Sequence, residues 1–298
     1  MLTGMQVLFL GGDARQVEVI RKLNELEASV SVCGFETCSQ HMGAVTFVPC
    51  EPSFFAVADV VILPAAGTDD HGEVAAPFGK STLKLTNELA EQLPKHAVIY
   101  TGMARPYLQQ LCAMHELKLV ELFERDDVAI FNSIPTAEGA LKMAIENTDF
   151  TIHNSSSIVL GFGRTGFTMA RALQALGSKV KVGVRRSEHY ARAFEMGLEP
   201  FYINDFQHHV SKIDLIFNTI PTMIVTAQII AKMPVHAVII DLASKPGGTD
   251  FRFAEKQGIK ALLAPGLPGI VAPLTAGRII ADCLVQLMMD DISNRRNE

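Results

Sequence analysis

The chain has 298 residues, of which 48% are hydrophobic and 19% are charged, and its formal net charge is −6 at pH 7. A negative balance argues against non-specific binding to nucleic acid. The sequence contains no apolar run long enough to span a membrane, so we expect no transmembrane helix. The N-terminus has no charged segment followed by a long apolar core, so we expect a cytoplasmic protein without a signal peptide.

Five cysteines form no C-x-x-C pair, and their number is odd. This pattern predicts reduced thiols in the cytosol and excludes a disulfide framework or a zinc site. The pair His208-His209 is interpreted as surface, because no cluster of histidine, cysteine and aspartate has metal-ligand spacing. A slightly apolar mean hydropathy of +0.23 indicates surface buried against another subunit, so we expect an oligomer.

The first half of the chain alternates short apolar runs with amphipathic segments. This pattern predicts a parallel sheet covered by helices on both faces. Ligands of such sheets gather at the carboxyl ends of the strands, here near residues 11–15, 65–80 and 102–105. The predicted strands are 7–10, 30–34, 60–63, 97–101 and 117–122, and the predicted helices are 15–26 and 106–115.

A polar connector over 124–132 and a helix over 135–147, with Pro135 in its first turn, lead into the second half. We therefore place a substrate domain at 1–134 and a Rossmann domain at 135–272. The helix that begins at Pro273 carries apolar residues on one face. It either completes the first domain with residues 273–298 or packs within the second, and its packing alone leaves both open. The face consists of Ile279, Ile280, Cys283, Leu284, Leu287 and Met288.

A glycine-rich turn opens the second domain with the sequence Gly-Phe-Gly-Arg-Thr-Gly over 161–166. It follows an apolar strand (158–160) and precedes a helix expected from about 165 to 176, the context that a dinucleotide fingerprint requires. Gly161 allows the tight turn, Gly163 lets a pyrophosphate approach the backbone, and Gly166 lets the helix pack closely. The free N–H groups at the start of this helix face the phosphates, and Arg164 and Thr165 are also expected to bind the cofactor. The alternative is a glycine-rich turn with no ligand.

The next strand, 180–184, is followed by Arg185, Arg186 and Ser187. NAD-specific sites usually carry an acidic residue here, which would repel a 2′-phosphate, whereas a guanidinium binds it through a planar fork. The pattern therefore favours NADP, and the alternative is a solvated basic pair at a strand end. Further strands are expected at 215–218, 238–242 and 260–264. The residues expected to face the cofactor after them are Asn218, Thr219, Ile220, Pro221, Asp241, Leu242 and Pro268.

The order of an N-terminal flavodoxin-like domain, a Rossmann domain and a final helix resembles the group of alanine dehydrogenases, formate dehydrogenases and adenosylhomocysteinases. The fold class expected is therefore α/β with two doubly wound domains. The loop Gly-Leu-Pro-Gly-Ile-Val-Ala-Pro over 266–273 looks like the nicotinamide loop of alanine dehydrogenases. More specifically, Gly-Gly-Asp-Ala-Arg-Gln at 11–16 and Ala-Pro-Gly-Leu-Pro-Gly at 264–269 resemble the A subunits of dipicolinate synthases of spore-forming bacilli.

That resemblance implies NADP-dependent oxidation of dihydrodipicolinate to pyridine-2,6-dicarboxylate in the mother cell of a sporulating bacterium. It also implies a heteromer with a smaller, flavoprotein-like B subunit. A substrate with two carboxylates needs cationic residues at the strand ends, and the candidates are Arg15, Lys80 and Arg105. For the proton, His71 is the preferred histidine, and Asp13 could take the proton or orient Arg15. The alternatives are solvated surface charges and, for Asp13, a helix cap.

Two other functions remain open at this point. The first is another NADP-linked oxidoreductase that acts on an amino or keto acid. The second is a non-catalytic NADP-binding subunit, which the sequence supports only because no catalytic base stands out.

Overall fold

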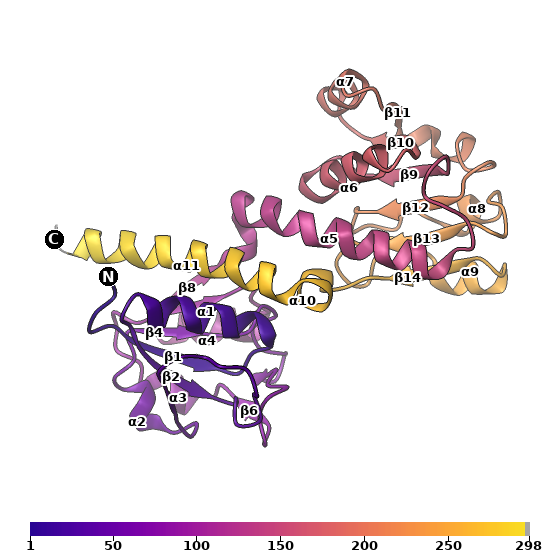
Figure 1. The fold of residues 1–298 in the computed structure, drawn as a ribbon. Helices are drawn as coiled ribbons and strands as arrows, with labels where there is room; N and C mark the ends of the chain where they lie inside the picture. The colour runs from indigo at the N-terminus through magenta and orange to yellow at the C-terminus, as the bar shows by residue number, and fades with distance from the viewer. Residues whose placement is uncertain (296–298) are drawn as a thin grey trace. The chain divides into compact units, whose positions relative to one another are not determined.

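The computed structural model describes residues 1–295 and divides the chain into two compact units (Figure 1). Unit 1 comprises Met1–Val128 together with the segment that begins at Ala272, and unit 2 comprises Ala129–Val271. The chain therefore leaves unit 1 for unit 2 and returns at its C-terminal end. Each unit has its own parallel six-stranded sheet, and together these sheets confirm the α/β class with two doubly wound domains.

The unit 1 sheet has the order β3-β2-β1-β4-β7-β8. That is the 3-2-1-4-5-6 order of Rossmann folds, and it corrects the expectation of a flavodoxin-like order. The difference arises from β3, a short and largely exposed edge strand. Its apolar pattern is too weak to predict a strand from the sequence. The strands are β1 (Gln6–Leu10), β2 (Ser29–Cys33), β3 (Val45–Phe47), β4 (Val60–Ile62), β7 (Val98–Thr101) and β8 (Lys118–Glu121), with a hairpin of β5 (Glu73–Val74) and β6 (Leu83–Lys84).

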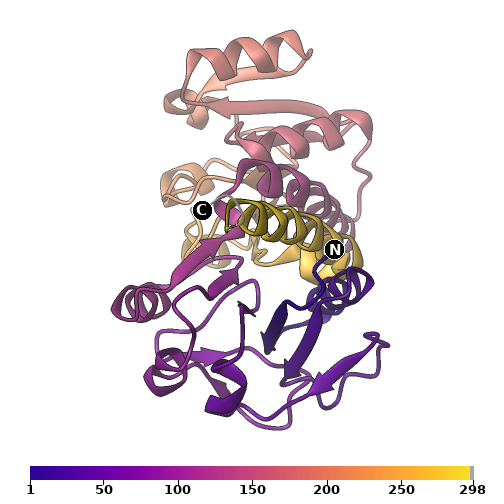
Figure 2. The ribbon, with the colours of Figure 1, turned by 90° about the vertical axis from the view of Figure 1, so that its left-hand side faces the viewer.

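One face of this sheet is covered by α1 (Ala14–Glu25) and by α11 (Pro273–Arg295), which lie side by side (Figures 1 and 2). Ile280, Cys283, Leu284 and Met288 of α11 are buried in the same core as Phe9 of β1. Ile279 and Leu287 pack against that core, so the predicted apolar face is confirmed. The open question about the last helix is thereby decided in favour of unit 1.

The other face of the sheet carries α2 (Pro52–Phe55), α3 (Asn87–Glu91) and α4 (Pro106–Met114). Of these three helices, the sequence pattern predicts only α4, because the other two are short and contribute few core residues. The second core of unit 1 lies beneath them and includes Leu63, Leu85 and Leu108.

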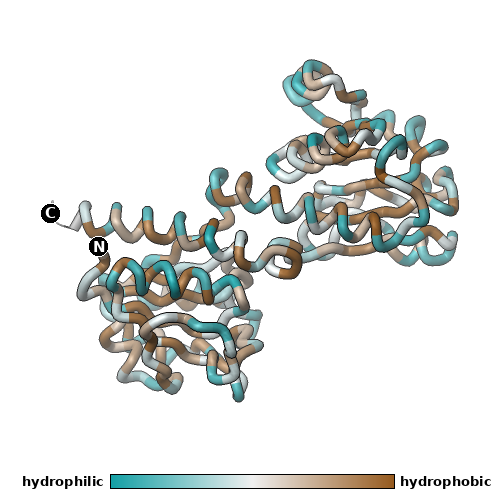
Figure 3. The backbone as a smooth tube through the Cα atoms, in the orientation of Figure 1, coloured by the Kyte–Doolittle hydropathy of each residue, from teal (hydrophilic) through white to brown (hydrophobic). Residues whose placement is uncertain are grey.

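Unit 2 repeats the 3-2-1-4-5-6 order with strands β11-β10-β9-β12-β13-β14. Its apolar strands stand out in brown in the hydropathy view (Figure 3). The strands are β9 (Ser156–Leu160), β10 (Lys179–Val184), β11 (Glu199–Tyr202), β12 (Leu215–Asn218), β13 (Val238–Asp241) and β14 (Lys260–Leu263). The helices are α6 (Arg164–Ala175), α7 (Ser187–Glu195), α8 (Ala227–Ile230), α9 (Phe251–Lys256) and α10 (Leu267–Val271), with a short 3₁₀ turn at Ile203–His208. A second 3₁₀ turn, at Leu122–Glu124, belongs to unit 1.

The long helix α5 runs from Asp126 to Asn147, so the polar connector expected over 124–132 is wrong. Two acidic residues, Asp126 and Asp127, begin the helix, where negative charge is favourable, and Val128 is buried in the unit 1 core. Pro135 lies inside the helix rather than in its first turn. The division into units falls within α5 after Val128, six residues before the predicted boundary at 134.

Among the described residues 1–295, none of the helices is both long and apolar enough to cross a bilayer. Within the same residues, no group of three or more histidine, cysteine, aspartate or glutamate side chains could hold a metal ion.

A close backbone approach joins α1 to α11. A Cβ atom placed on Gly277 would lie 2.5 Å from the carbonyl oxygen of Arg15 and 2.8 Å from the Cβ of Glu18. We therefore expect Gly277→Val to force the helices apart and to destabilise unit 1 by about 1–3 kcal/mol. The midpoint of urea unfolding is the measurement. Thr275→Val, at an exposed position of the same helix, is the control, and equal midpoints for the two variants would contradict this packing.

Candidate functional site

A pocket of about 470 Å³ lies in unit 2 at the carboxyl ends of β9, β10 and β12. Ligands of open α/β sheets bind at this edge, where the strand order reverses. The pocket contains ten of the residues predicted to bind cofactor: Gly161, Gly163, Arg164, Thr165, Gly166, Arg185, Arg186, Thr219, Ile220 and Pro221. It also contains four residues that the sequence reasoning missed: Phe162, Val184, His189 and Ile203.

The three glycines of the turn differ in what surrounds them. Gly161 has φ +91°, and a Cβ there would lie 2.4 Å from Thr219 Oγ1. A Cβ on Gly166 would lie 2.2 Å from the carbonyl oxygen of Gly161, so α6 packs directly against the turn. A Cβ on Gly163 would meet nothing within 4 Å. Only this glycine faces open space, which is the geometry that a pyrophosphate approaching the backbone requires.

Gly163 is also the N-cap residue of α6, and no side chain caps that helix end. The first N–H groups of an α-helix have no partner within the helix and attract anions together with the helix dipole. The turn therefore presents backbone donors to the pocket without a competing side-chain acceptor, as an anion site at a helix N-terminus does.

The two arginines after β10 have different surroundings. Arg186 is an ion-pair partner of Glu188 (Nε to Oε1, 3.1 Å), and its Nη2 donates to His189 Nε2 at 2.7 Å. Arg185 donates from Nη2 to Thr222 Oγ1 at 3.3 Å. Both guanidinium groups are exposed, and Arg185 also lines a neighbouring pocket of about 260 Å³ with Tyr202 and Asn204. Ser187, the first residue of α7, is exposed and does not line either pocket.

Asn218 and Asp241, which were predicted to face the cofactor, are fully buried and bonded to their own loops. Asn218 donates from Nδ2 to Asp241 Oδ1 and to the carbonyl of Ile220, both at 3.0 Å, and accepts from Ile220 N. The other carboxylate oxygen of Asp241 accepts from Gly248 N at 2.8 Å and from Thr249 Oγ1 at 2.6 Å. The pair therefore positions the loops after β12 and β13, which include pocket residues Ile220 and Pro221.

Leu242 and Pro268 lie outside the cofactor pocket of unit 2. Leu242 is half-buried and packs against the unit 2 core. Pro268 is half-buried in α10. Their roles at a nicotinamide therefore stay predictions.

In unit 1, Asp13 and Arg15 form a bidentate ion pair at the end of β1. Arg15 donates to the carboxylate from Nε at 3.0 Å and 3.2 Å and from Nη2 at 2.6 Å. Asp13 also caps α1 in a capping box with Gln16. Burial opposes ionisation, yet the hydrogen bonds and charge of Arg15 outweigh it and lower the pKa of Asp13. Asp13 is thus an ionised helix cap whose carboxylate also binds the Arg15 guanidinium.

The other predicted substrate residues are His71, Lys80 and Arg105, and all three are exposed. His71 lies in a turn in which the Asp69 carboxylate accepts from the backbone N–H groups of His71 and Glu73, at 2.8 and 2.7 Å. These bonds, that of His71 first, lower the pKa of Asp69, and the charge of Arg105 adds to the effect. The backbone N–H of Lys80 donates to Glu36.

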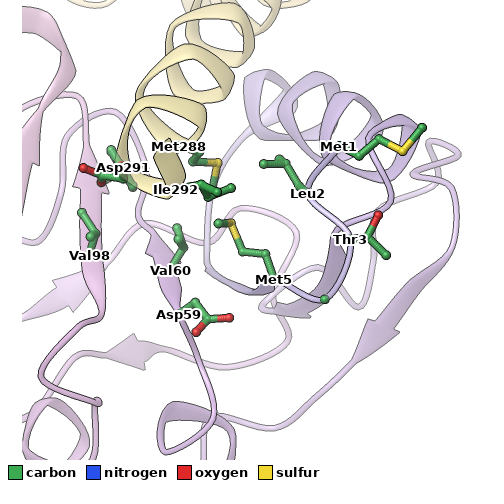
Figure 4. A pocket seen from close by; sticks show the side chains of 12 residues that line it. Met1, Leu2, Thr3, Met5, Asp59, Val60, Val98, Met288, Asp291 and Ile292 are labelled. Atoms are coloured by element: carbon green, nitrogen blue, oxygen red, sulfur yellow. Dashed lines mark hydrogen bonds between the residues drawn. The ribbon is translucent and has the colours of Figure 1, made fainter. Parts of the chain in front are cut away.

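A further pocket of about 250 Å³ lies at the opposite, amino-terminal end of the unit 1 strands (Figure 4). Its wall combines Met5 with residues from the starts of β4 and β7 and with Asp291 of α11. Asp291 binds Lys118 Nζ at 2.7 Å, and Asp59 accepts from Gln6 N at 2.8 Å. Since these carboxylates are paired within the chain and lie away from the carboxyl edge, we assign no substrate to this pocket.

Both units resemble known proteins. Residues 6–123 match the family model of the N-terminal domain of the dipicolinate synthase A subunit, and residues 157–245 match that of the coenzyme F420-dependent NADP oxidoreductases. The A subunit of dipicolinate synthase from Bacillus subtilis strain 168 is 48% identical over 290 residues, covering 97% of this chain and 98% of the relative.

Solved structures agree with that relationship. The crystal structure of the dipicolinate synthase A subunit from Bacillus halodurans is 52% identical, covers 96% of this chain and 98% of its own, and superposes with a TM-score of 0.93. An L-alanine dehydrogenase, at 14% identity, a TM-score of 0.61 and coverage of 94% and 88%, shares the fold alone. The oxidoreductase class and a nicotinamide-type dinucleotide site in unit 2 follow from the family model and the Rossmann turn.

Gly163 offers a test of the phosphate turn that separates binding from folding. Because its Cβ position is open and its φ is −84°, we expect Gly163→Val to fold like the parent and to lose dinucleotide binding. Calorimetric titration and thermal unfolding are the measurements.

The contrasting variant is Gly161→Val, which clashes with Thr219 and should lower the unfolding temperature as well. A Gly163→Val protein that binds the cofactor like the parent would show that this turn is not the phosphate site.

Proposed function

Because this chain belongs to the family of dipicolinate synthase A subunits, we propose that it oxidises dihydrodipicolinate to pyridine-2,6-dicarboxylate with NADP. The observation that carries the proposal is the unit 2 pocket, in which the open Gly163 turn and the side chains of Arg164, Arg185 and Arg186 surround the same space. By resemblance to its relatives, the chain works with a smaller, flavoprotein-like B subunit in the cytoplasm of the mother cell during sporulation. The Bacillus subtilis relative is named as one subunit of a synthase, which supports such a partner.

NADP bound in the unit 2 pocket would supply the acceptor for a hydride from the substrate. The reaction also removes a proton from the dihydropyridine, and the product ring is aromatic. A strong base is therefore unnecessary, and the main task of the protein is to orient the substrate, which is worth several kcal/mol. The surroundings of His71 agree with this weak requirement for a base, because His71 is an exposed histidine in a turn and not a buried one.

For the substrate carboxylates, Arg15 is our leading candidate. Its Nε and Nη2 are bonded to Asp13, so its guanidinium orientation is already determined, whereas Nη1 is outside that contact. The side chain is 14% exposed, which restricts its motion more than that of Lys80 or Arg105. A preorganised guanidinium loses less entropy when it binds a carboxylate than a mobile one does.

The choice between NADP and NAD is testable at the end of β10. We expect Arg185→Asp combined with Arg186→Ala to weaken NADP much more than NAD, because each charge-assisted contact to the 2′-phosphate contributes roughly 1.5–3 kcal/mol. Calorimetry with both cofactors is the measurement. Arg192→Ala is the matched control, since this exposed arginine of α7 pairs with Glu195 and lies outside the pocket. A parent protein that prefers NAD would refute the NADP proposal.

The substrate role of Arg15 is tested by kinetics. Arg15→Ala should lower kcat/KM for dihydrodipicolinate by about 2 kcal/mol, or roughly thirtyfold, through a higher KM and with NADP affinity little changed. Arg15→Lys should recover only part, because an ammonium group cannot bind Asp13 through two nitrogens and still present a third donor in a fixed direction. Unchanged kinetics in Arg15→Ala would transfer the role to Lys80 or Arg105.

The reaction itself is tested by giving the purified chain dihydrodipicolinate and NADP, with and without the B subunit. Formation of NADPH by the chain alone would establish the catalytic role. Formation only with the B subunit would favour the non-catalytic NADP-binding subunit. Turnover of pyruvate plus ammonia instead would favour an amino or keto acid oxidoreductase.

A further inference from the structure

Two cysteines of unit 1 lie together although seventeen positions separate them in the sequence. Cys33 is the last residue of β2, and β2 pairs in parallel with β3 so that Val32 is opposite Phe47. The next backbone bond, from Val48 N to Val32 O at 3.0 Å, continues the register and places Cys33 beside Val48. Cys50 follows two residues after Val48, in the bend that leads to α2, and lines the same pocket as Cys33.

Packing agrees with that register. Cys33 and Val48 are buried in the same core, and Cys50 packs against it from the edge. Both cysteines line a pocket of about 460 Å³ together with Glu36, Thr82 and Lys84. Cys33 is 2% exposed, whereas Cys50 is only partly buried. A dissolved small molecule entering this pocket therefore meets Cys50 first.

The two thiols are unequal. The hydrogen bond to Cys50, followed by burial, raises the pKa of Cys33, while the hydrogen bond from Cys33 lowers the pKa of Cys50 despite burial. Because Cys50 is also the more accessible of the two, it is the member of the pair that meets electrophiles from solvent. Cys112 differs, because burial raises its pKa to about 11 and it lies in the core.

We propose that Cys50 and Cys33 form an oxidisable thiol pair, with Cys50 as the attacking thiol and Cys33 as the resolving thiol. The oxidant is a hydroperoxide. The Cys50 thiolate attacks the terminal peroxide oxygen, the O–O bond breaks, and hydrogen peroxide yields a sulfenic acid and hydroxide, which is protonated to water. The Cys33 sulfur then attacks the Cys50 sulfur, and the second oxygen leaves as water. Two thiols and one peroxide thus give one disulfide and two waters.

The disulfide would close a loop that includes β3 and would join the end of β2 to the segment after β3. The carbonyl of Cys33 accepts from Gly11 N at 2.9 Å, in the turn that leads to Asp13. Oxidation would therefore restrain the end of β2 and the segment after β3, next to the Gly11 turn at the carboxyl edge of unit 1. This inference does not depend on the proposed reaction with dihydrodipicolinate.

The test treats the reduced full chain with hydrogen peroxide, blocks the remaining thiols by alkylation and maps the peptides by mass spectrometry. We expect a disulfide between Cys33 and Cys50, with Cys38, Cys112 and Cys283 still alkylated. We also expect Cys50 to be consumed at least about tenfold faster than the partly buried Cys38. In Cys33→Ala, Cys50 should stop at the sulfenic acid, which dimedone traps, and Cys38→Ala should form the disulfide like the parent.

Three results would overturn the proposal: five alkylated thiols after treatment of the parent, a disulfide that involves another cysteine, or oxidation of Cys38 as fast as Cys50. The measurement on the parent chain decides the question even if Cys33→Ala does not fold.

Discussion

The candidate cofactor site depends on how closely α6 approaches the turn that precedes it. A Cβ on Gly166 would lie 2.2 Å from the Gly161 carbonyl, a distance that no side chain tolerates. The start of α6 is therefore held against the ends of β9 and β12, and its free N–H groups face the pocket. Gly163 faces open space in the same turn. The turn therefore packs closely against α6 at Gly166 and leaves its backbone accessible to a ligand at Gly163.

The loops that follow β12 and β13, next to that turn, are stabilised by a buried hydrogen-bond network. Asp241, buried at the end of β13, accepts hydrogen bonds from Asn218, Gly248 and Thr249. A buried carboxylate is costly unless it is satisfied in this way, and breaking such a network usually destabilises a protein strongly. The network thus connects Asn218 and Asp241, two of the predicted cofactor residues, to the loop that carries pocket residues Ile220 and Pro221.

Unit 1 uses an ion pair for a comparable purpose. Asp13 caps α1 and at the same time binds Arg15 through both carboxylate oxygens. The carboxylate thus couples the orientation of a cationic side chain to the start of a helix, and α11 packs against that helix from the far end of the sequence. Asp13 and Arg15 therefore lie at the start of the same helix, α1, that α11 covers where the chain returns to unit 1.

The sequence by itself determined the strands of both sheets that are apolar and buried, the glycine turn, and most of the pocket residues. Local pattern suffices there, since a buried parallel strand reads as a continuous apolar run, as in Val60–Ile62, and a phosphate turn needs glycines at defined spacings. The sequence also predicted the apolar face of the last helix. It could not decide which unit that face covers, because either core could bury it.

Only the tertiary structure decided the features that depend on contacts between distant residues. The edge strand β3 is short and largely exposed, so only its pairing with β2 identifies it. The Rossmann-type strand order of unit 1 depends on the same pairing. His189 lines the pocket because α7 places it beside Arg186 and Phe162. Asn218 and Asp241 carry no local sign of whether they face a ligand or each other. The structure shows that they are buried and bonded to each other across neighbouring strands, and both properties arise from the packed fold rather than from the order of residues.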